Sequence, residues 1–266
     1  MEAIVLAGGR NSRLGDVAQG LPKPLVSVAG RPLCSFSLER LAAVGVKRVI
    51  VSCARGKGLL FASELRPFVD EVVIAEEGKP LGRGGGIKHA ARFRREVGPV
   101  FVVLGDEIID LDFTAFEAQH KSHKAQATIT VTPLPTPFGV VENDRESGQV
   151  YGFAEAPFLP HWVNAGVYIL SDEAISRLPA AGDTERDLFP ALAAEGSLYC
   201  YHHEGLWLTV DTPKDLERAR IWAIDQAEIA LAEKPFGSTL ASDSLRLTEA
   251  ATAAVRHKEP VESSAK

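Results

Sequence analysis

The residues most able to do chemistry stand near the amino terminus, in a stretch suited to holding phosphate groups. A short apolar run ends in Gly8 and Gly9, and a turn of two glycines leaves backbone N–H groups unscreened by side chains. Arg13 can chelate phosphate oxygens in a bidentate way, whereas Lys23 supplies a point charge between two prolines. The spacing matches neither a Walker A sequence nor GxGxxG. These residues therefore predict a phosphate site of another kind.

The elements that position these residues alternate between short β-branched runs and helical stretches. Strands are expected at 3–6, 49–53, 71–75 and 100–104, and helices at 33–44 and 87–95, the second helix after a glycine-rich loop over 82–86. Continuous apolar strands separated by helices predict a parallel sheet covered on both faces. The order is that of a doubly wound α/β fold, in which ligands bind outside the carboxyl ends of the strands.

The second half of the chain changes character. Strands are expected at 127–132, 139–142, 150–153 and 167–170, and a long helix at 213–231. These strands are expected to add antiparallel or mixed sheet to the parallel core. Residues 1–235 are therefore expected to form one domain. Residues 236–266, rich in Ala, Ser, Thr and Glu with little periodicity, are expected to form a C-terminal helix or flexible tail.

Composition narrows the class of protein. The 266 residues are 45% hydrophobic and 24% charged, which is ordinary for a globular protein. A formal net charge of -6 argues against a nucleic-acid partner, which would need a basic surface. No apolar run is long enough to cross a membrane, and three scattered cysteines suit free thiols in a reducing compartment. We therefore expect a soluble, cytoplasmic protein without a membrane partner.

The segment LAGGRNSRL…LPKPLVSVAGRPL resembles the signature of the sugar-1-phosphate nucleotidyltransferases, whose usual form is LAGGxGTRL followed by PKPL. The resemblance continues in order through PLGRGGGI (80–87), LGD (104–106), FGVVE (138–142), EAP (155–157), VNAGVY (163–168) and WLTVDTP (207–213). ERDLFP (185–190) is typical of short members that act on mannose or heptose 1-phosphates. Together these motifs imply a Rossmann-like α/β/α three-layer fold with a mixed, mostly parallel central sheet.

The resemblance also implies a reaction. A nucleoside monophosphate would pass from an NTP to a sugar 1-phosphate, with release of pyrophosphate and with Mg²⁺ as cofactor. Arg13 and the metal would sit on the leaving pyrophosphate, Lys23 on the α-phosphate, and Asp106 would hold the metal. The nucleophile is already an anion, so no general base is needed, and catalysis consists of positioning and charge neutralisation.

Binding residues follow from the same resemblance, position by position. The nucleotide would contact the glycine turn, the two basic residues and the base-side loop, which comprise Leu6, Ala7, Gly8, Gly9, Arg13, Lys23, Glu77, Gly82 and Gly85. The sugar phosphate would face Gly139, Glu155 and Asn164. Two ordinary alternatives stay open: Asp106 as a turn or cap residue after a strand, and Glu155 as a solvated carboxylate near a turn.

Three departures from the family pattern bear on this site. Ala156 replaces the lysine of EKP, which contacts the sugar phosphate in the family. Thr209 stands at the position of the second metal-ligand aspartate, and Asp211, on the same side of an extended strand, could serve instead. Arg83 replaces a small residue of the base-side loop, where it could reach a phosphate or base edge or point to solvent.

GTP with a mannose- or heptose-like 1-phosphate is the first expectation for the substrates, and a cyclitol phosphate would fit the change at Ala156. A thymidylyl-, uridylyl- or cytidylyltransferase of the same family stays open. A GT-A-like glycosyltransferase is disfavoured, because Asp110-Leu111-Asp112 falls off the expected strand end. A non-catalytic regulatory relative that binds nucleotide sugars is the remaining alternative. Dimers are frequent among similar proteins, so a homodimer is also expected.

Overall fold

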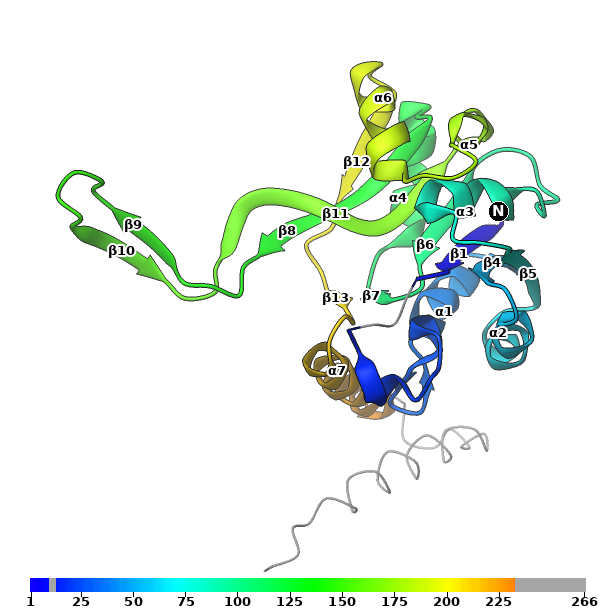
Figure 1. The fold of residues 1–266 in the computed structure, drawn as a ribbon, viewed down its shortest axis with the longest axis horizontal. Helices are drawn as coiled ribbons and strands as arrows, with labels where there is room; N and C mark the ends of the chain where they lie inside the picture. Colours follow the sequence, from blue (N-terminus) through cyan, green and yellow to red (C-terminus); the bar gives the residue numbers. More distant parts are fainter. Residues whose placement is uncertain (10–12, 233–266) are drawn as a thin grey trace, which may run out of the picture.

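The computed structural model describes residues 1–9 and 13–232, so the segment expected as a helix or tail at 236–266 lies outside the described residues. At its centre is a seven-stranded sheet with the strand order β12-β8-β11-β6-β1-β4-β5 (Figure 1). The pairings make β11 antiparallel to both of its neighbours, β6 and β8, while every other neighbouring pair is parallel. The expected mixed, mostly parallel sheet is thus confirmed.

The parallel half of the sheet is built from apolar strands. The strands of the sheet are β1 (Ala3–Ala7), β4 (Arg48–Ala54), β5 (Glu71–Glu77), β6 (Val100–Leu104), β8 (Ala127–Pro135), β11 (Phe158–Leu170) and β12 (Leu198–His202). In β1, Val5 pairs with Val51 of β4 on one side and with Val103 of β6 on the other. A strand that is covered on both faces must be largely apolar, and β1 and β6 are apolar along their whole length, whereas β4 carries the buried Ser52 within an otherwise apolar run from Val49 to Cys53.

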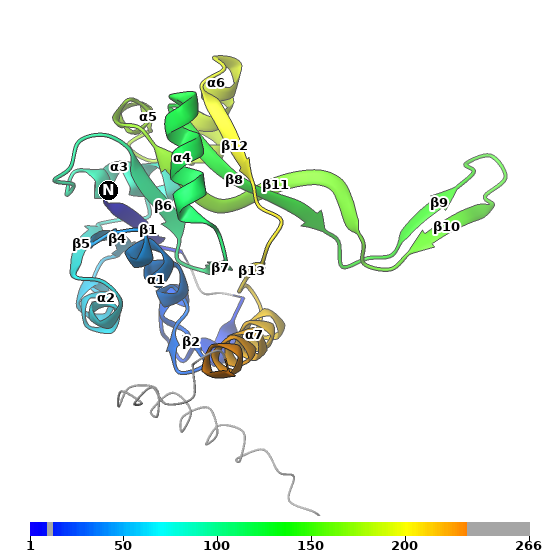
Figure 2. The ribbon, with the colours of Figure 1, turned by 180° about the vertical axis from the view of Figure 1, so that it is seen from behind.

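Helices cover both faces of the sheet (Figures 1 and 2). On one face, α1 (Ser35–Ala43), α2 (Gly58–Leu65) and α4 (Phe113–His123) pack against the core that contains Val5. On the other face, α3 (Gly82–Ala91), α5 (Asp172–Arg177) and α6 (Phe189–Ala194) pack against the core that contains Ile4. Successive side chains of a strand point to opposite faces, so one strand feeds both cores. The three-layer α/β/α arrangement is confirmed.

A third, smaller core joins residues 14–36 to residues 206–223. It packs α7 (Pro213–Ala232) against β2 (Ser27–Val28), which pairs with β3 (Arg31–Pro32). The same core includes residues of β7 (Glu107–Ile109) and β13 (Trp207–Thr209), which pair with each other. The expected helix over 213–231 is therefore present. In the described part of the chain, no helix has the length and apolar character needed to cross a membrane.

The glycine-rich segment 82–86 is helical, and the expectation of a loop there was wrong. α3 begins at Gly82, five residues before the expected start. A Cβ atom on Gly84 would lie 3.2 Å from the carbonyl oxygen of Gly182, and one on Gly85 would lie 2.8 Å from that of Ala180. The glycines therefore let the first turn of α3 pack directly against the backbone of residues 180–184.

A long β-arm projects from the sheet. β8 and β11 run past the other strands and lead into a hairpin of β9 (Val140–Asn143) and β10 (Val150–Ala154), drawn in green far from the helices in Figure 1. Large apolar side chains on this arm are exposed, namely Phe138, Val141, Val150, Tyr151, Phe153, Phe158 and Trp162. Most of the exposed large apolar residues of the described chain thus gather on one element.

Candidate active site

A cavity of about 400 Å³ opens where β1, β5 and β6 end. Most of the predicted site residues line it, namely Leu6, Ala7, Gly8, Gly9, Arg13, Lys23, Glu77, Gly82, Asp106 and Asp211. The carboxyl ends of neighbouring parallel strands meet at one edge of a sheet, so residues that follow each strand converge there. The cavity therefore lies where a doubly wound sheet binds its ligands.

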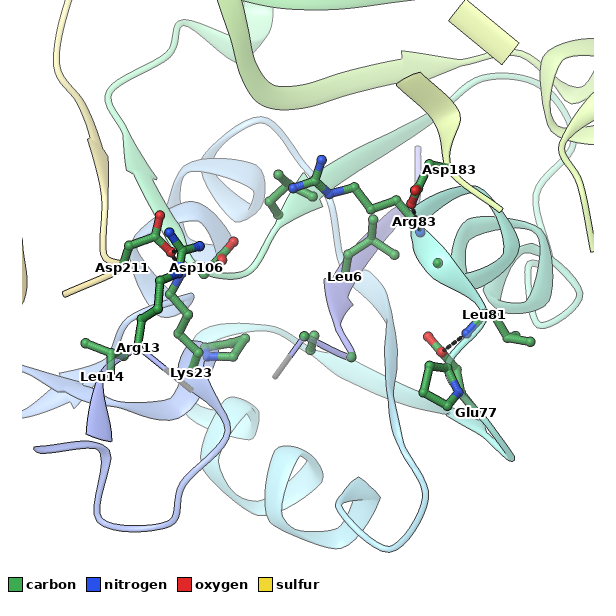
Figure 3. A pocket seen from close by; sticks show the side chains of 17 residues that line it. Leu6, Arg13, Leu14, Lys23, Glu77, Leu81, Arg83, Asp106, Asp183 and Asp211 are labelled. Atoms are coloured by element: carbon green, nitrogen blue, oxygen red, sulfur yellow. Dashed lines mark hydrogen bonds and ion pairs between the residues drawn. The ribbon is translucent and has the colours of Figure 1, made fainter. Parts of the chain in front are cut away.

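Lys23 is the centre of an ion-pair cluster at one end of the cavity (Figure 3). Its Nζ atom donates to Asp106 Oδ2 and to Asp211 Oδ1, at 2.6 Å in each case. Arg13 Nη2 lies 3.0 Å from the same oxygen of Asp211. The side chain of Lys23 is only 11% exposed, whereas that of Arg13 is 71% exposed. One buried cation thus holds two carboxylates together, and a second, accessible cation stands beside them.

A short antiparallel pairing brings Asp211 to this cluster. β13 pairs with β7 so that Thr209 lies opposite Glu107, and the N–H of Val210 donates to the carbonyl oxygen of Asp106 at 3.2 Å. The next residue, Asp211, therefore lies beside Asp106. Asp211 lines the cavity and Thr209 does not. A carboxylate therefore lines the cavity two residues after Thr209, and its service as the second metal ligand stays a prediction.

The donor set of this cluster fits Mg²⁺. Mg²⁺ is usually held by one or two carboxylates together with substrate phosphates and waters, and Asp106 and Asp211 already converge on one cation. The described residues contain no group of three or more His, Cys, Asp or Glu side chains that could hold a metal ion by themselves. Two carboxylates suit a metal ion whose remaining ligands come from a bound nucleotide and water better than an ion held by protein side chains alone.

Glu77 marks the opposite end of the cavity. Its side chain is buried, and its two oxygens accept hydrogen bonds from Ser52 Oγ at 2.8 Å and from the N–H of Leu81 at 3.0 Å. A Cβ atom on Gly8 would lie 3.1 Å from Glu77 Oε1, so the glycine turn passes close to this carboxylate. Among the predicted base-side residues, Gly82 lines the cavity, whereas Gly85 is buried inside α3 and does not.

The three predicted sugar contacts do not line the cavity. Gly139 and Glu155 lie on the β-arm, where a Cβ atom on Gly139 would be 3.0 Å from Glu155 Oε2. Asn164 lies in β11, and its amide donates to Tyr168 Oη at 2.8 Å while its oxygen accepts from the N–H of Gly166 at 3.1 Å. The first two residues are thus neighbours of each other, and the third stabilises a bend of β11. Their contact with sugar stays a prediction.

Two cavity residues were not assigned a firm role from the sequence. Arg83 extends from the start of α3 across the cavity, and Asp183 lies beside it (Figure 3). The N–H of Arg83 donates to Asp183 Oδ1 at 3.2 Å, so the two residues form one wall. Asp183 is 100 residues away along the chain and matches no motif. The sequence carried no local signal that could have placed it here.

Glu107, next to Asp106, is a further residue that the sequence did not single out. Burial, and then the negative charge of Asp106, raise the pKa of Glu107 to about 8. Trp207 Nε1 donates to Glu107 Oε2 at 3.3 Å. A side chain on Gly166 would overlap this carboxylate, and Gly166 also has a φ of +72°. Glu107 is thus a half-buried neighbour of the ion-pair cluster, with a pKa above the ordinary value of a glutamate.

Known proteins resemble this chain in sequence and in fold. The chain is 34% identical, over 224 residues, to the mannose-1-phosphate guanylyltransferase catalytic subunit beta of Dictyostelium discoideum. That match covers 81% of this chain and 62% of the relative, so the chain spans about three fifths of that relative's length. The crystal structure of HddC from Yersinia pseudotuberculosis has a TM-score of 0.66 and 25% identity, over 84% of this chain and 99% of HddC. HddC complexed with GMP-PN has a TM-score of 0.64, at 24% identity.

Residues 2–224 match the nucleotidyl transferase family along nearly the whole described chain. The matched range contains the glycine turn, Lys23, Asp106 and Asp211, which the fold gathers around one cavity. The order of the motifs, the layers of the fold and the contents of the cavity agree, and the chain belongs to the nucleotidyl transferase family.

Proposed function

We propose that this protein transfers GMP from GTP to a mannose- or heptose-like sugar 1-phosphate, giving a GDP-sugar and pyrophosphate. The observation that carries the proposal is the cluster in which Lys23 holds Asp106 and Asp211 beside Arg13. In a nucleotidyl transferase, such a cluster supplies the charges that a triphosphate and its metal require. The names of the relatives support guanylyl transfer to mannose 1-phosphate.

The reaction needs positioning more than proton transfer. A phosphate oxygen of the acceptor attacks the α-phosphorus of GTP in line, the bond to the bridging oxygen of the β-phosphate breaks, and pyrophosphate leaves with the electron pair. Lys23 would exchange its two carboxylate partners for the oxygens of the α-phosphate. Arg13, accessible and bidentate, would neutralise the leaving pyrophosphate. The backbone N–H groups of Gly8 and Gly9 would approach the phosphates without side-chain screening.

Asp106 and Asp211 would hold Mg²⁺ in this reaction. When bound, the ion screens the charge of the triphosphate oxygens and favours loss of pyrophosphate. The pairing of β7 with β13, and the hydrogen bond from Val210 to Asp106, hold the two carboxylates side by side, as ligands of one ion would need to be. Lys23 keeps the same two carboxylates together before the nucleotide enters.

Glu77 supports guanine as the base. A carboxylate has about four lone-pair sites, and Ser52 and Leu81 occupy two of those on Glu77. The remaining two could accept the N1–H and the exocyclic amino group of guanine side by side. Uracil and thymine offer one such ring N–H and no adjacent amino group. The fixed, buried position of Glu77 at the cavity wall therefore favours GTP over UTP and dTTP.

We also propose a cytoplasmic location and a homodimer. The three cysteines are free, with Cys34 and Cys53 buried and Cys200 exposed, which suits a reducing compartment. The apolar side chains exposed on the β-arm are of the kind that a second copy of a chain covers. Light scattering across a range of protein concentrations tests the dimer, and a monomer throughout would contradict it.

Pyrophosphate release with Mg²⁺ tests the reaction. Five nucleotides (ATP, GTP, CTP, UTP and dTTP) are combined with mannose, heptose and cyclitol phosphates as acceptors. We expect the wild type to release pyrophosphate with GTP and one acceptor. Asp106→Ala should abolish this release and Asp211→Asn should reduce it about 100-fold or more, because each variant loses contacts to the metal and the phosphates. Thr209→Val is the matched control and should keep turnover within about threefold, because Thr209 does not line the cavity and valine has nearly the same shape. No release with any pair would refute the proposal.

A further inference from the structure

Two phosphate-bearing substrates must share one cavity, and its cations are unevenly distributed. Among the described residues that line it, the lysine and arginine side chains are Arg13, Lys23 and Arg83. Arg13 and Lys23 belong to the cluster around Asp211, at the end assigned above to the triphosphate. Arg83 approaches from the opposite wall, with its side chain directed across the cavity (Figure 3). One cation is thus left for the second phosphate.

Arg83 is held at both ends and remains accessible. Its backbone N–H donates to Asp183 Oδ1 at 3.2 Å, and its Nη1 donates to Glu185 Oε1 at 2.8 Å. Tyr168 donates to the same Glu185 oxygen at 3.3 Å. The Arg83 side chain is nevertheless 52% exposed, so a ligand can reach the guanidinium. A cation that is already oriented loses less conformational entropy when it binds an anion.

The second oxygen of Glu185 gives the pair an additional property. Glu185 Oε2 is buried and has no hydrogen-bond partner among the described residues. The carboxylate is therefore only partly satisfied by Arg83 and Tyr168. A buried acceptor without a donor is unfavourable, so this carboxylate depends on the two donors it has, the Arg83 guanidinium and the Tyr168 hydroxyl. Glu185 thus lies behind Arg83, where it can orient the guanidinium, and Arg83 is the member of the pair that lines the cavity.

The usual cation for the acceptor phosphate is missing from this chain. In the family that the sequence resembles, a lysine contacts the sugar phosphate, and the matching position here is Ala156. Ala156 lies on the β-arm, outside the cavity. A reaction that brings two anions together needs a positive charge for each of them. The chain must supply the second charge from another element.

We infer that Arg83 binds the phosphate of the acceptor, and that Glu185 is the positioning residue that aims its guanidinium. This inference rests on the proposed function. The fork of N–H donors lets Arg83 keep one bond to Glu185 while offering others to phosphate oxygens. Arg83 on α3 thereby takes over the role of the absent lysine. The acceptor phosphate lies between Arg83 and the α-phosphate bound at Lys23.

Steady-state kinetics of Arg83→Gln test the assignment. The probes are GTP and the acceptor with the highest turnover, beginning with mannose 1-phosphate. We expect the KM for the acceptor to rise about 10- to 100-fold, as for the loss of one charge-assisted hydrogen bond, while the KM for GTP stays within about twofold. Glu185→Gln should raise the acceptor KM by a smaller factor, about 3- to 10-fold, again without changing the KM for GTP.

Arg186→Gln is the matched control, because Arg186 is exposed and does not line the cavity. Calorimetric titration gives a second readout, of binding without turnover. Mannose 1-phosphate is titrated into enzyme that is saturated with a GTP analogue, in which a methylene group bridges the α- and β-phosphorus atoms and prevents the reaction. If Arg83→Gln fails to fold, Arg83→Lys replaces it and should show an intermediate loss, because lysine keeps the charge but not the fork.

Each outcome decides the matter. A selective loss of acceptor binding supports the inference. An active enzyme whose Arg83→Gln variant keeps its acceptor KM, or loses affinity for GTP instead, overturns the inference and leaves the proposed function intact. A wild-type enzyme that releases no pyrophosphate with any pair overturns the proposed function and, with it, the role of Arg83.

Discussion

Replacing Lys23 by methionine should weaken the free protein and make its stability depend on Mg²⁺. The substitution keeps an unbranched side chain of similar length but leaves Asp106 and Asp211 without the shared cation. Both carboxylate oxygens lie 2.6 Å from Nζ, so they can be no more than 5.2 Å apart, twice that distance. Two like charges at this separation repel by about 3 kcal/mol at an effective dielectric constant near 20, and by about 1 kcal/mol in bulk water.

The side chains of Asp106 and Asp211 are 38% and 31% exposed, which places the cost between these limits, at about 2 kcal/mol. For a domain of this size, that cost corresponds to a fall in Tm of roughly 4–8 °C. Millimolar Mg²⁺ should restore most of the loss in Lys23→Met and change the wild type much less, because in the wild type the ammonium group already occupies the space between the carboxylates.

Thermal unfolding followed by circular dichroism, with and without Mg²⁺, measures both effects. Lys57→Met is the control, since Lys57 is exposed and lies outside the cavity. A Lys23→Met protein that is as stable as the wild type would show that the two carboxylates do not depend on this cation. A destabilised variant that does not respond to Mg²⁺ would equally refute the assignment of Asp106 and Asp211 as a metal pair.

Two further predictions concern the packing. Gly85→Ala should lower the free energy of unfolding by about 1–3 kcal/mol, because the added Cβ would lie 2.8 Å from the carbonyl oxygen of Ala180. Denaturant titration measures this change, and unchanged stability would contradict the close packing of α3. Burial raises the pKa of the Cys34 and Cys53 thiols to about 12, so only Cys200 should react quickly with a thiol reagent at neutral pH, with the other two reacting after denaturation. Fast reaction of all three thiols in the native protein would show that the two buried sites open readily.

The parts of the site that follow strands could be predicted from the sequence. Gly8 and Gly9 follow one continuous apolar run, Asp106 stands two residues after the end of another, and the carboxyl ends of parallel strands meet at one edge of the sheet. The spacing of WLTVDTP also indicated Asp211 as a substitute for the residue missing at 209. In these cases the signal is local, because the strand and the residue it positions are neighbours in the chain.

The remaining features depend on contacts between distant segments. The glycine-rich segment 82–86 was expected to be a loop, because nothing nearby in the sequence explains its glycines. They are needed for close packing against the backbone of residues 180–184, about a hundred residues away. Asp183 and Glu185 matter only because α3 packs on that segment. The hairpin strands β9 and β10 were predicted, but β11 was expected only over 167–170, so its extension back to Phe158 and the projection of the β-arm were not predicted. The pairing of β8 with β11 is irregular between Asn164 and Tyr168, which no local pattern in the sequence indicates.

The ion-pair cluster also determines how late during synthesis and folding the site can form. Lys23 is 83 residues from Asp106 and 188 residues from Asp211 along the chain. At synthesis rates of roughly 5–20 residues per second, Asp211 leaves the ribosome about 10–40 s after Lys23. Contacts of such long range form late, because the loops between them must close first. A nucleotide therefore cannot guide the early folding of this chain, and its stabilising effect should appear as slower unfolding of the finished protein.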